Sequence, residues 1–148
     1  MRSVTIACSL LFMLLSINAT IAPPAFGAGP DWVMLDENDE SSFFYDKAGT
    51  SKPEEGIVRV NTRVVYTEEG KAEAVKMLPS IDNSGKLYES RYLHDLNCGE
   101  RESRLLNASH LDKDGGVLKS TDLSSFTEWE AIPPEVRMML VLQDACVQ

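Results

Sequence analysis

Polar and apolar residues alternate most regularly between Ile57 and Thr67, which predicts a β-strand with one buried and one solvent-facing side. The side expected to be buried carries Val58, Val60, Thr62, Val64 and Tyr66. The opposite side carries Arg59, Asn61 and Arg63. Because side chains alternate across a strand, this register requires Arg59 and Arg63 to point away from the core.

Shorter patterns of the same kind predict the rest of an antiparallel sheet. Further strands are expected at residues 32–35, 43–45, 86–98, 100–111 and 117–121. The first two are typical of a hairpin with a long polar connection at residues 36–42. Lys52–Gly56 is expected to break the chain before the central strand. Asp112–Gly116 predicts a tight hairpin turn, because Asp-Gly and Gly-Gly adopt positive φ at little cost.

Two segments follow a helical period. Residues 67–78 predict a short helix, although Gly70 lowers its helix propensity. Near the end of the chain, Pro133 and Pro134 suit the first turn of a second helix. The apolar stripe of that helix is expected to be Val136, Met139, Leu140, Leu142 and Cys146. We therefore predict an α+β fold, an antiparallel sheet of about six strands with a C-terminal α-helix packed on one face.

The hydrophobic core of this fold follows from the same faces. In the 86–98 strand, Tyr88, Tyr92, Leu96 and Cys98 alternate toward one side. We expect that side and the C-terminal helix to enclose a single cluster. Its predicted members are Val58, Val60, Val64, Tyr88, Tyr92, Val136 and Met139.

The N-terminus has the layout of a secretory signal peptide. A positive charge at Arg2, an uncharged apolar run at residues 4–17 and a small-x-small pattern at residues 25–27 follow one another. A transmembrane anchor is the alternative, but the run is shorter than the roughly 20 residues of a spanning helix and a proline pair follows it. We predict a signal peptide at residues 1–27, a single exported domain at residues 28–148 and no stable membrane insertion after cleavage.

The excess of acidic residues disfavours negatively charged binding partners. The formal net charge is −9 at pH 7, which disfavours binding to nucleic-acid phosphates and to anionic lipid surfaces. The acidic residues are spread from Asp31 to Asp144 without a run of five like charges, as is typical of a solvated surface.

The cysteines indicate a structural disulfide. Cys8 lies inside the predicted signal peptide and leaves with it, so Cys98 and Cys146 remain. An exported domain with two cysteines has one intramolecular pairing available. A redox-active pair is more often C-x-x-C, which is absent from this sequence. We predict a Cys98–Cys146 bridge that fixes the C-terminal helix to the sheet.

Several motifs, in this order, resemble the bacterial surface-adhesin protein E-like family. They are Trp32-Val33, Phe44–Lys47, Ile57–Val60, the strand ending in Cys98, Asp112–Leu118, Trp129–Pro134 and the final helix with Cys146. The resemblance spans about residues 31–147. It implies an antiparallel sheet curved around a C-terminal helix and export to the Gram-negative envelope. It also implies binding of host extracellular-matrix and serum proteins, the activity of the family's named member.

The sequence offers little for catalysis or metal binding. His94 and His110 are its two histidines, and no G-x-S-x-G motif accompanies them. No His-x-x-x-His or C-x-x-C motif supplies metal ligands, and the Asp112-x-Asp114-Gly segment lacks the closing Glu of a calcium loop. We predict no catalytic residue, no cofactor and no metal site, and we expect His94 to lie against the core.

Trp129 is the one candidate contact residue. One interpretation is that Trp129 and Ile132 form a lid over the end of the core, and the other is that Trp129 is an aromatic contact site. The leading functional hypothesis is an exported, non-enzymatic envelope or cell-surface protein that binds another macromolecule, with exposed strand edges as the expected contact surface. The alternative is a periplasmic small-ligand binder or inhibitor with a cavity beneath the C-terminal helix. The identity of the protein partner, the choice between periplasm and outer surface, and the oligomeric state are left open.

Overall fold

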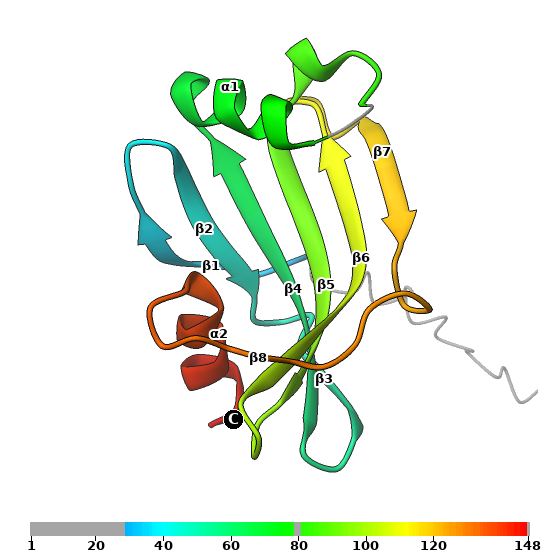
Figure 1. Ribbon diagram of the computed structural model, residues 1–148. Helices are drawn as coiled ribbons and strands as arrows, with labels where there is room; N and C mark the ends of the chain where they lie inside the picture. The colour runs from blue at the N-terminus through cyan, green and yellow to red at the C-terminus, as the bar shows by residue number, and fades with distance from the viewer. Residues whose placement is uncertain (1–28, 79–80, 148) are drawn as a thin grey trace, which may run out of the picture.

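The structure, a computed structural model, describes residues 29–78 and 81–147 (Figure 1). The predicted signal peptide, residues 1–27, lies outside the described residues and stays a prediction. The strands are β1 (Trp32–Glu37), β2 (Ser41–Asp46), β3 (Ser51–Glu54), β4 (Ile57–Tyr66), β5 (Glu89–Asn97), β6 (Glu102–Leu111), β7 (Val117–Asp122) and β8 (Glu130–Ala131). The helices are α1 (Glu68–Met77), the short 3₁₀ helix η1 (Ser84–Lys86) and α2 (Arg137–Ala145).

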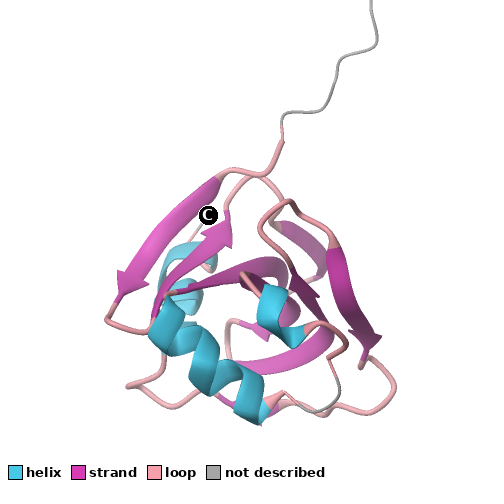
Figure 2. Ribbon diagram, turned by 90° about the horizontal axis from the view of Figure 1, so that it is seen from above, coloured by secondary structure: helices cyan, strands magenta, loops and turns pink. Residues whose placement is uncertain are grey.

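The eight strands of the described chain form one antiparallel sheet. Six of them follow the order β1-β2-β4-β5-β6-β7, while β3 pairs with β4 and β8 pairs with β6. Figures 1 and 2 show the sheet strongly curved, with α1 and α2 at opposite ends of it. The predicted α+β fold with a C-terminal helix is therefore confirmed, and β3 and β8 are short additions at the margin of the six-stranded path.

The β1–β2 hairpin has a shorter connection than the sequence predicted. Polar residues at the ends of both strands join the ladder, so that Glu37 pairs with Ser42 and only residues 38–40 remain as the turn. The side chain of Asn38 holds this turn, because its Oδ1 accepts hydrogen bonds from the backbone N–H groups of Glu40 and Ser41 at 3.0 and 2.9 Å.

The expected break at residues 52–56 is partly a strand. β3 pairs with β4 through Ser51 and Glu54 only, and the chain turns at Gly56, whose φ is 77°. Pro53 has no N–H to give a ladder, and it is tolerated because β3 lies at the margin of the sheet. The prediction of a break was therefore wrong for the residues that precede the turn.

Alternation in β4 separates the two faces of the sheet as predicted. Val58, Val60 and Thr62 are buried on the side that packs against α2. Arg59 and Arg63 point to the opposite side, where they meet carboxylates of β5. The strand register predicted from the sequence is confirmed.

Helix α1 begins and ends where the sequence indicates. Thr67 is its N-cap, and the threonine Oγ1 accepts a hydrogen bond from Gly70 N at 3.1 Å. The same hydroxyl donates to the carbonyl oxygen of Asp39 at 2.8 Å, which ties the helix start to the β1–β2 turn. Gly70 is required at this junction, because a Cβ at this position would lie 1.9 Å from the carbonyl oxygen of Glu40. Gly70, which lowers the helix propensity of this segment, is thus the residue that allows α1 to pack closely against the β1–β2 turn.

Helix α2 begins later than predicted and presents a different face. It starts at Arg137 with Val136 as its N-cap, so Pro133 and Pro134 precede the helix. Val136 is 41% exposed and Leu140 is 37% exposed, so the predictions that Val136 belongs to the core and Leu140 to the buried stripe were wrong. The buried positions of the helix are Val141, Leu142 and Ala145.

Arg137 explains this rotation of the helix. Its Nε donates to Asp36 Oδ2 at 2.6 Å, and its Nη1 donates to Ser41 Oγ at 2.7 Å. Its guanidinium carbon also lies 5.7 Å from the ring centroid of Phe43. These contacts turn Arg137 toward β1 and β2, and the adjacent Val136 points to solvent.

The core cluster lies between α2 and the first four strands of the path. Its buried members are Phe43, Tyr45, Val58, Val60, Leu96, Ile132, Val141, Leu142 and Ala145. Val64 and Met139 are only partly buried against it, and Tyr88 and Tyr92 are half-buried outside the cluster. The predicted core is therefore correct for Val58 and Val60 and too broad for the two tyrosines. The large aromatic residues at its centre come from β2 instead.

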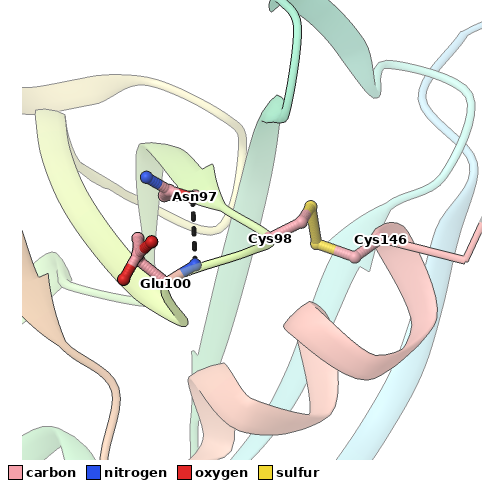
Figure 3. The surroundings of a disulfide bond; sticks show 4 residues. All are labelled: Asn97, Cys98, Glu100 and Cys146. Carbon is pink, nitrogen blue, oxygen red and sulfur yellow. Dashed lines mark hydrogen bonds between the residues drawn. A yellow bond between two sulfur atoms is a disulfide. The ribbon is translucent and has the colours of Figure 1, made fainter.

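The predicted disulfide is confirmed. Cys98 directly follows β5 and Cys146 caps the end of α2, and their Cα atoms are 5.7 Å apart (Figure 3). Beside Cys98, the side chain of Asn97 accepts a hydrogen bond from Glu100 N at 3.1 Å and shapes the β5–β6 turn. The bridge fixes the C-terminal end of the helix to the sheet.

Candidate functional site

The face of the sheet that points away from α2 collects most of the arginines. Four of the six arginines in the described residues lie on it, in the central strands β4, β5 and β6. They are Arg59, Arg63, Arg91 and Arg104. We call this side of the sheet the arginine face. The four guanidinium groups form two clusters, each built around one buried carboxylate.

The Glu89 cluster consists of Glu89, Arg63, Arg91 and Trp32. Glu89 is 2% exposed, and its two oxygens accept hydrogen bonds from Arg63 Nε and Arg91 Nε, both at 2.6 Å. Arg63 Nη2 donates to the same carboxylate. The ring of Trp32 on the edge strand lies 5.7 Å from the guanidinium carbons of both arginines. One carboxylate and one indole therefore hold two cations in place.

The Asp95 cluster repeats this arrangement and consists of Asp95, Arg59, Arg104 and Trp129. Arg59 binds Asp95 through Nε and Nη2 at 2.7 and 3.0 Å, and Arg104 Nη2 donates to it at 3.0 Å. Trp129 lies over Arg104 with 4.9 Å between the guanidinium carbon and the ring centroid. Burial acts to raise the pKa of Asp95, but the hydrogen bonds and charges of the two arginines outweigh it and hold that pKa below its ordinary value.

A shallow groove runs between the two clusters. One hollow of about 220 Å³ includes Asn61 and Arg91, and a second of about 450 Å³ includes Arg59 and Arg104. The two hollows share Leu93 and Asn107 in their linings, so they lie side by side on β5 and β6 with these two residues between them. The groove thus has an apolar centre, amide side chains beside it, and arginines at both ends.

The opposite, helix-facing side carries a buried polar chain instead. Tyr66 OH donates to Ser90 Oγ at 2.9 Å, and Ser90 Oγ lies 2.7 Å from His110 Nδ1. Burial raises the pKa of Tyr66 and lowers the pKa of His110. Ser90 is fully buried, so its hydroxyl is out of reach of a substrate. This chain of hydrogen bonds satisfies polar groups in the interior and does not form a nucleophilic site.

His94 lies on the same helix-facing side, as predicted. It is opposite Val60 in the sheet, and burial lowers the pKa of its imidazole to about 4 despite the nearby charge of Asp95. Its Nδ1 is buried without a hydrogen-bond partner in the described chain. No group of three or more His, Cys, Asp or Glu side chains within residues 29–78 and 81–147 is placed to hold a metal ion.

Trp129 and Ile132, which the sequence grouped as a lid, go to different sides. Ile132 is buried in the core cluster, whereas Trp129 stacks on Arg104 of the arginine face. The lid interpretation therefore holds for Ile132 alone. The role of Trp129 as a contact residue stays a prediction, and the structure brings it together with three charged residues that the sequence did not link to it.

The arginines of β4 on this face are evident from the sequence pattern, whereas its two carboxylates are not. Alternation in β4 placed Arg59 and Arg63 on the outer side, but Glu89 and Asp95 were counted with the solvated acidic residues. Arg91, Leu93 and Asp95 occur at alternate positions of β5, which is the signal that would have placed them on the same face.

The edges of the sheet are poor contact surfaces by comparison. β1 has an irregularity in its pairing between Met34 and Asp36, and the β6–β7 ladder has one between His110 and Leu111. Lys119 adds a charged side chain to β7. Bulges and lysines on edge strands oppose pairing with another chain, so the arginine face is the better candidate than the strand edges that the sequence favoured.

Comparison with known proteins gives one match. The family model described as surface-adhesin protein E matches residues 32–147. No curated protein and no solved structure matches the chain. Among the residues described, no helix has the length and apolar character that a bilayer crossing requires.

Proposed function

This chain belongs to the surface-adhesin protein E family, and from that premise we propose that it is an exported cell-surface protein that binds another protein through the arginine face. The predicted signal peptide at residues 1–27 supports export. The family description supports a place on the cell surface and a role in adhesion, and we propose that this role is non-enzymatic.

One observation carries the choice of surface: arginine and tryptophan side chains gather on one side of the sheet around a groove. Arginine and tryptophan are enriched at the energetic centres of protein interfaces. The guanidinium groups here are already oriented by Glu89 and Asp95, so little side-chain freedom is lost when a partner binds.

A periplasmic small-ligand binder is the less favoured reading of the same fold. Val141 and Ala145 are fully buried between α2 and the sheet, so the centre of this contact is closed to solvent. A hollow of about 390 Å³ lies beside the disulfide and is open to solvent. Its lining residues are Cys98, Arg101, Met139, Leu142, Gln143, Cys146 and Val147. No enclosed site for a small apolar ligand is formed beneath the helix by these residues.

The test uses the mature protein, residues 28–148, on a biosensor surface with a panel of purified extracellular-matrix and serum proteins. We expect saturable binding of at least one of them at micromolar concentration. The double substitution Arg59→Ala with Arg91→Ala should abolish it while leaving each buried carboxylate one arginine partner. The matched control, Lys76→Ala with Lys113→Ala, makes the same change in net charge on other exposed surfaces and should bind normally.

Two outcomes would contradict the proposal. Absence of binding to every protein of the panel and to native envelope extract opposes a role in protein binding. Equal binding by both double variants places the contact surface elsewhere. Protease accessibility on intact cells separately tests the location, since a periplasmic protein is protected until the outer membrane is opened.

A further inference from the structure

The groove of the arginine face points to the chemistry of its partner. We infer that the groove binds an extended, acidic polypeptide segment whose two carboxylates are four residues apart, an inference that rests on the proposed function. The inference concerns the same surface and adds the class of ligand, which neither the family description nor the match supplies.

The arginine face presents guanidinium groups to solvent and keeps its two carboxylates buried. Glu89 and Asp95 are each 2% exposed and their oxygens already accept arginine hydrogen bonds. The Arg91 and Arg59 side chains are 41% and 38% exposed. Within the two clusters, a partner therefore meets guanidinium donors rather than carboxylate acceptors, although the whole chain is acidic.

The two clusters also leave some guanidinium N–H donors available. Arg91 donates only its Nε to Glu89, so the terminal nitrogens of this guanidinium have no hydrogen-bond partner in the described chain. Arg59 uses Nε and Nη2 on Asp95 and retains Nη1. A carboxylate is the group that the planar, always charged guanidinium binds best, through two parallel hydrogen bonds.

The spacing of the two exposed arginines matches that of side chains on an extended peptide. Arg91 lies opposite Arg63 in the sheet, and Arg59 precedes Arg63 by four residues on β4. With a rise of about 3.4 Å per residue and about 4.8 Å between strands, Arg91 and Arg59 are roughly 14 Å apart at their Cα atoms. Residues i and i+4 of an extended peptide are about 13 Å apart and point to the same side. The two distances match without bending the ligand.

The lining between the two arginines suits the backbone of an extended chain. Leu93 and Asn107 lie where the hollows meet, and Asn61 lies beside them. A primary amide both donates and accepts hydrogen bonds, which suits the backbone of an extended chain. Asp122 and Glu54 are acidic groups near the Asp95 cluster. Their negative charges would repel a further carboxylate of the ligand at this end of the groove. The groove is thereby suited to a segment with two separated acidic side chains.

The experiment measures binding of two fluorescent peptides of equal composition by anisotropy with the mature protein. One is Gly-Ser-Glu-Thr-Ser-Thr-Glu-Ser-Gly, and the other, Gly-Ser-Thr-Glu-Glu-Ser-Thr-Ser-Gly, has adjacent glutamates. We expect saturable binding of the first, about fivefold tighter than that of the second and weaker at high salt. The Arg59→Ala, Arg91→Ala protein should show no saturable binding up to about 2 mM peptide. The Lys76→Ala, Lys113→Ala protein should match the unmodified one.

Each contrary result has a definite meaning. Equal affinity for the two peptides overturns the spacing, and unchanged affinity in the arginine double variant overturns the site. A sulfated polysaccharide or single-stranded DNA that binds this groove while the peptides do not overturns the acidic polypeptide as its ligand. If the arginine double variant loses a protein of the matrix panel that neither peptide displaces, this inference fails and the proposed function stands. If no panel protein binds but the peptide with spaced glutamates does, the proposed function fails and the assignment of the groove to an acidic peptide stands.

Discussion

Arg63 on β4 and Arg91 on β5 lie directly opposite each other in the sheet, and both guanidinium groups donate to the one carboxylate of Glu89. Like charges in directly opposed positions destabilise a sheet. The arrangement is stable because the carboxylate lies between the two cations and the ring of Trp32 makes a cation–π contact with each of them. The same buried anion that stabilises the fold also fixes the cations that we assign to binding.

Replacing Glu89 should therefore destabilise the domain. Glu89→Gln leaves Arg63 and Arg91 opposed without a counter-charge. The expected loss is roughly 2 kcal/mol of unfolding free energy, less than for a fully buried pair because both arginines are partly exposed. Urea denaturation followed by tryptophan fluorescence measures it. Glu73→Gln, which breaks an exposed ion pair with Lys76 on α1, is the control and should change the free energy by less than about 0.5 kcal/mol. Equal effects of the two substitutions would show that the Glu89 cluster is energetically no different from a surface pair.

Removing the disulfide should lower stability more. The Cys98–Cys146 bridge closes a loop with a sequence separation of 48, which corresponds to about 4 kcal/mol in the chain-entropy model. Cys98→Ser with Cys146→Ser should lose most of that free energy in denaturant. The chemically reduced wild type is the internal control, because it should unfold at the same denaturant concentration as the double variant. A double variant as stable as the oxidised protein would mean that packing of α2 alone holds the helix.

The sequence predicts faces well here, because alternation is a local property. Val58, Val60, Arg59 and Arg63 all lie on the sides assigned to them. It does not predict which residue lies opposite which, because register depends on turns and bulges elsewhere in the sheet. Alternation in β5 assigns Asp95 to the outer face, but its meeting with Arg59 and Arg104 is a consequence of register and does not follow from periodicity.

The C-terminal helix shows the same limit. A proline pair and an apolar stripe gave a helix of the right kind and position, but its rotation depends on contacts with other elements. Arg137 binds Asp36 and Ser41, which lie about a hundred residues earlier in the chain. A stripe of apolar residues could not anticipate that a charged side chain would take the inward position in place of Val136.

Acid should destabilise the protein through His94. Its pKa falls from 6.5 to about 4 on folding because burial disfavours the imidazolium. The unfolded chain therefore binds the proton more readily, and stability is lost as pH falls from 6.5 toward 4, by roughly 3 kcal/mol in total. His110, whose pKa is also lowered, acts in the same direction. Asp95 contributes in a lower range, since its folded pKa lies below the ordinary carboxyl value.

The measurement is unfolding free energy in urea at several pH values between 4 and 7. In His94→Gln the loss of stability across this range should be much smaller than in the wild type, with the remaining slope assigned to His110. A variant with the same slope as the wild type would show that His94 does not account for the acid sensitivity.

Gly70→Ala should destabilise the domain although alanine is the better helix former. Intrinsic propensity favours alanine by about 1 kcal/mol inside a helix. At this position the new Cβ would lie 1.9 Å from the carbonyl oxygen of Glu40, a backbone atom that cannot rotate away. Helix α1 must then move off the β1–β2 turn, and the hydrogen bonds of Thr67 to Asp39 and Glu40 are stretched. The expected net loss is roughly 2 kcal/mol of unfolding free energy.

Gly85→Ala is the matched control, because a Cβ there meets no atom within 4 Å. It should leave the unfolding free energy measured in urea within about 0.5 kcal/mol of the wild-type value. The sign of the Gly70→Ala effect decides between two accounts of α1. Destabilisation means that close docking on the β1–β2 turn determines where the helix lies. Stabilisation would mean that local propensity dominates and that the helix and the turn are free to separate.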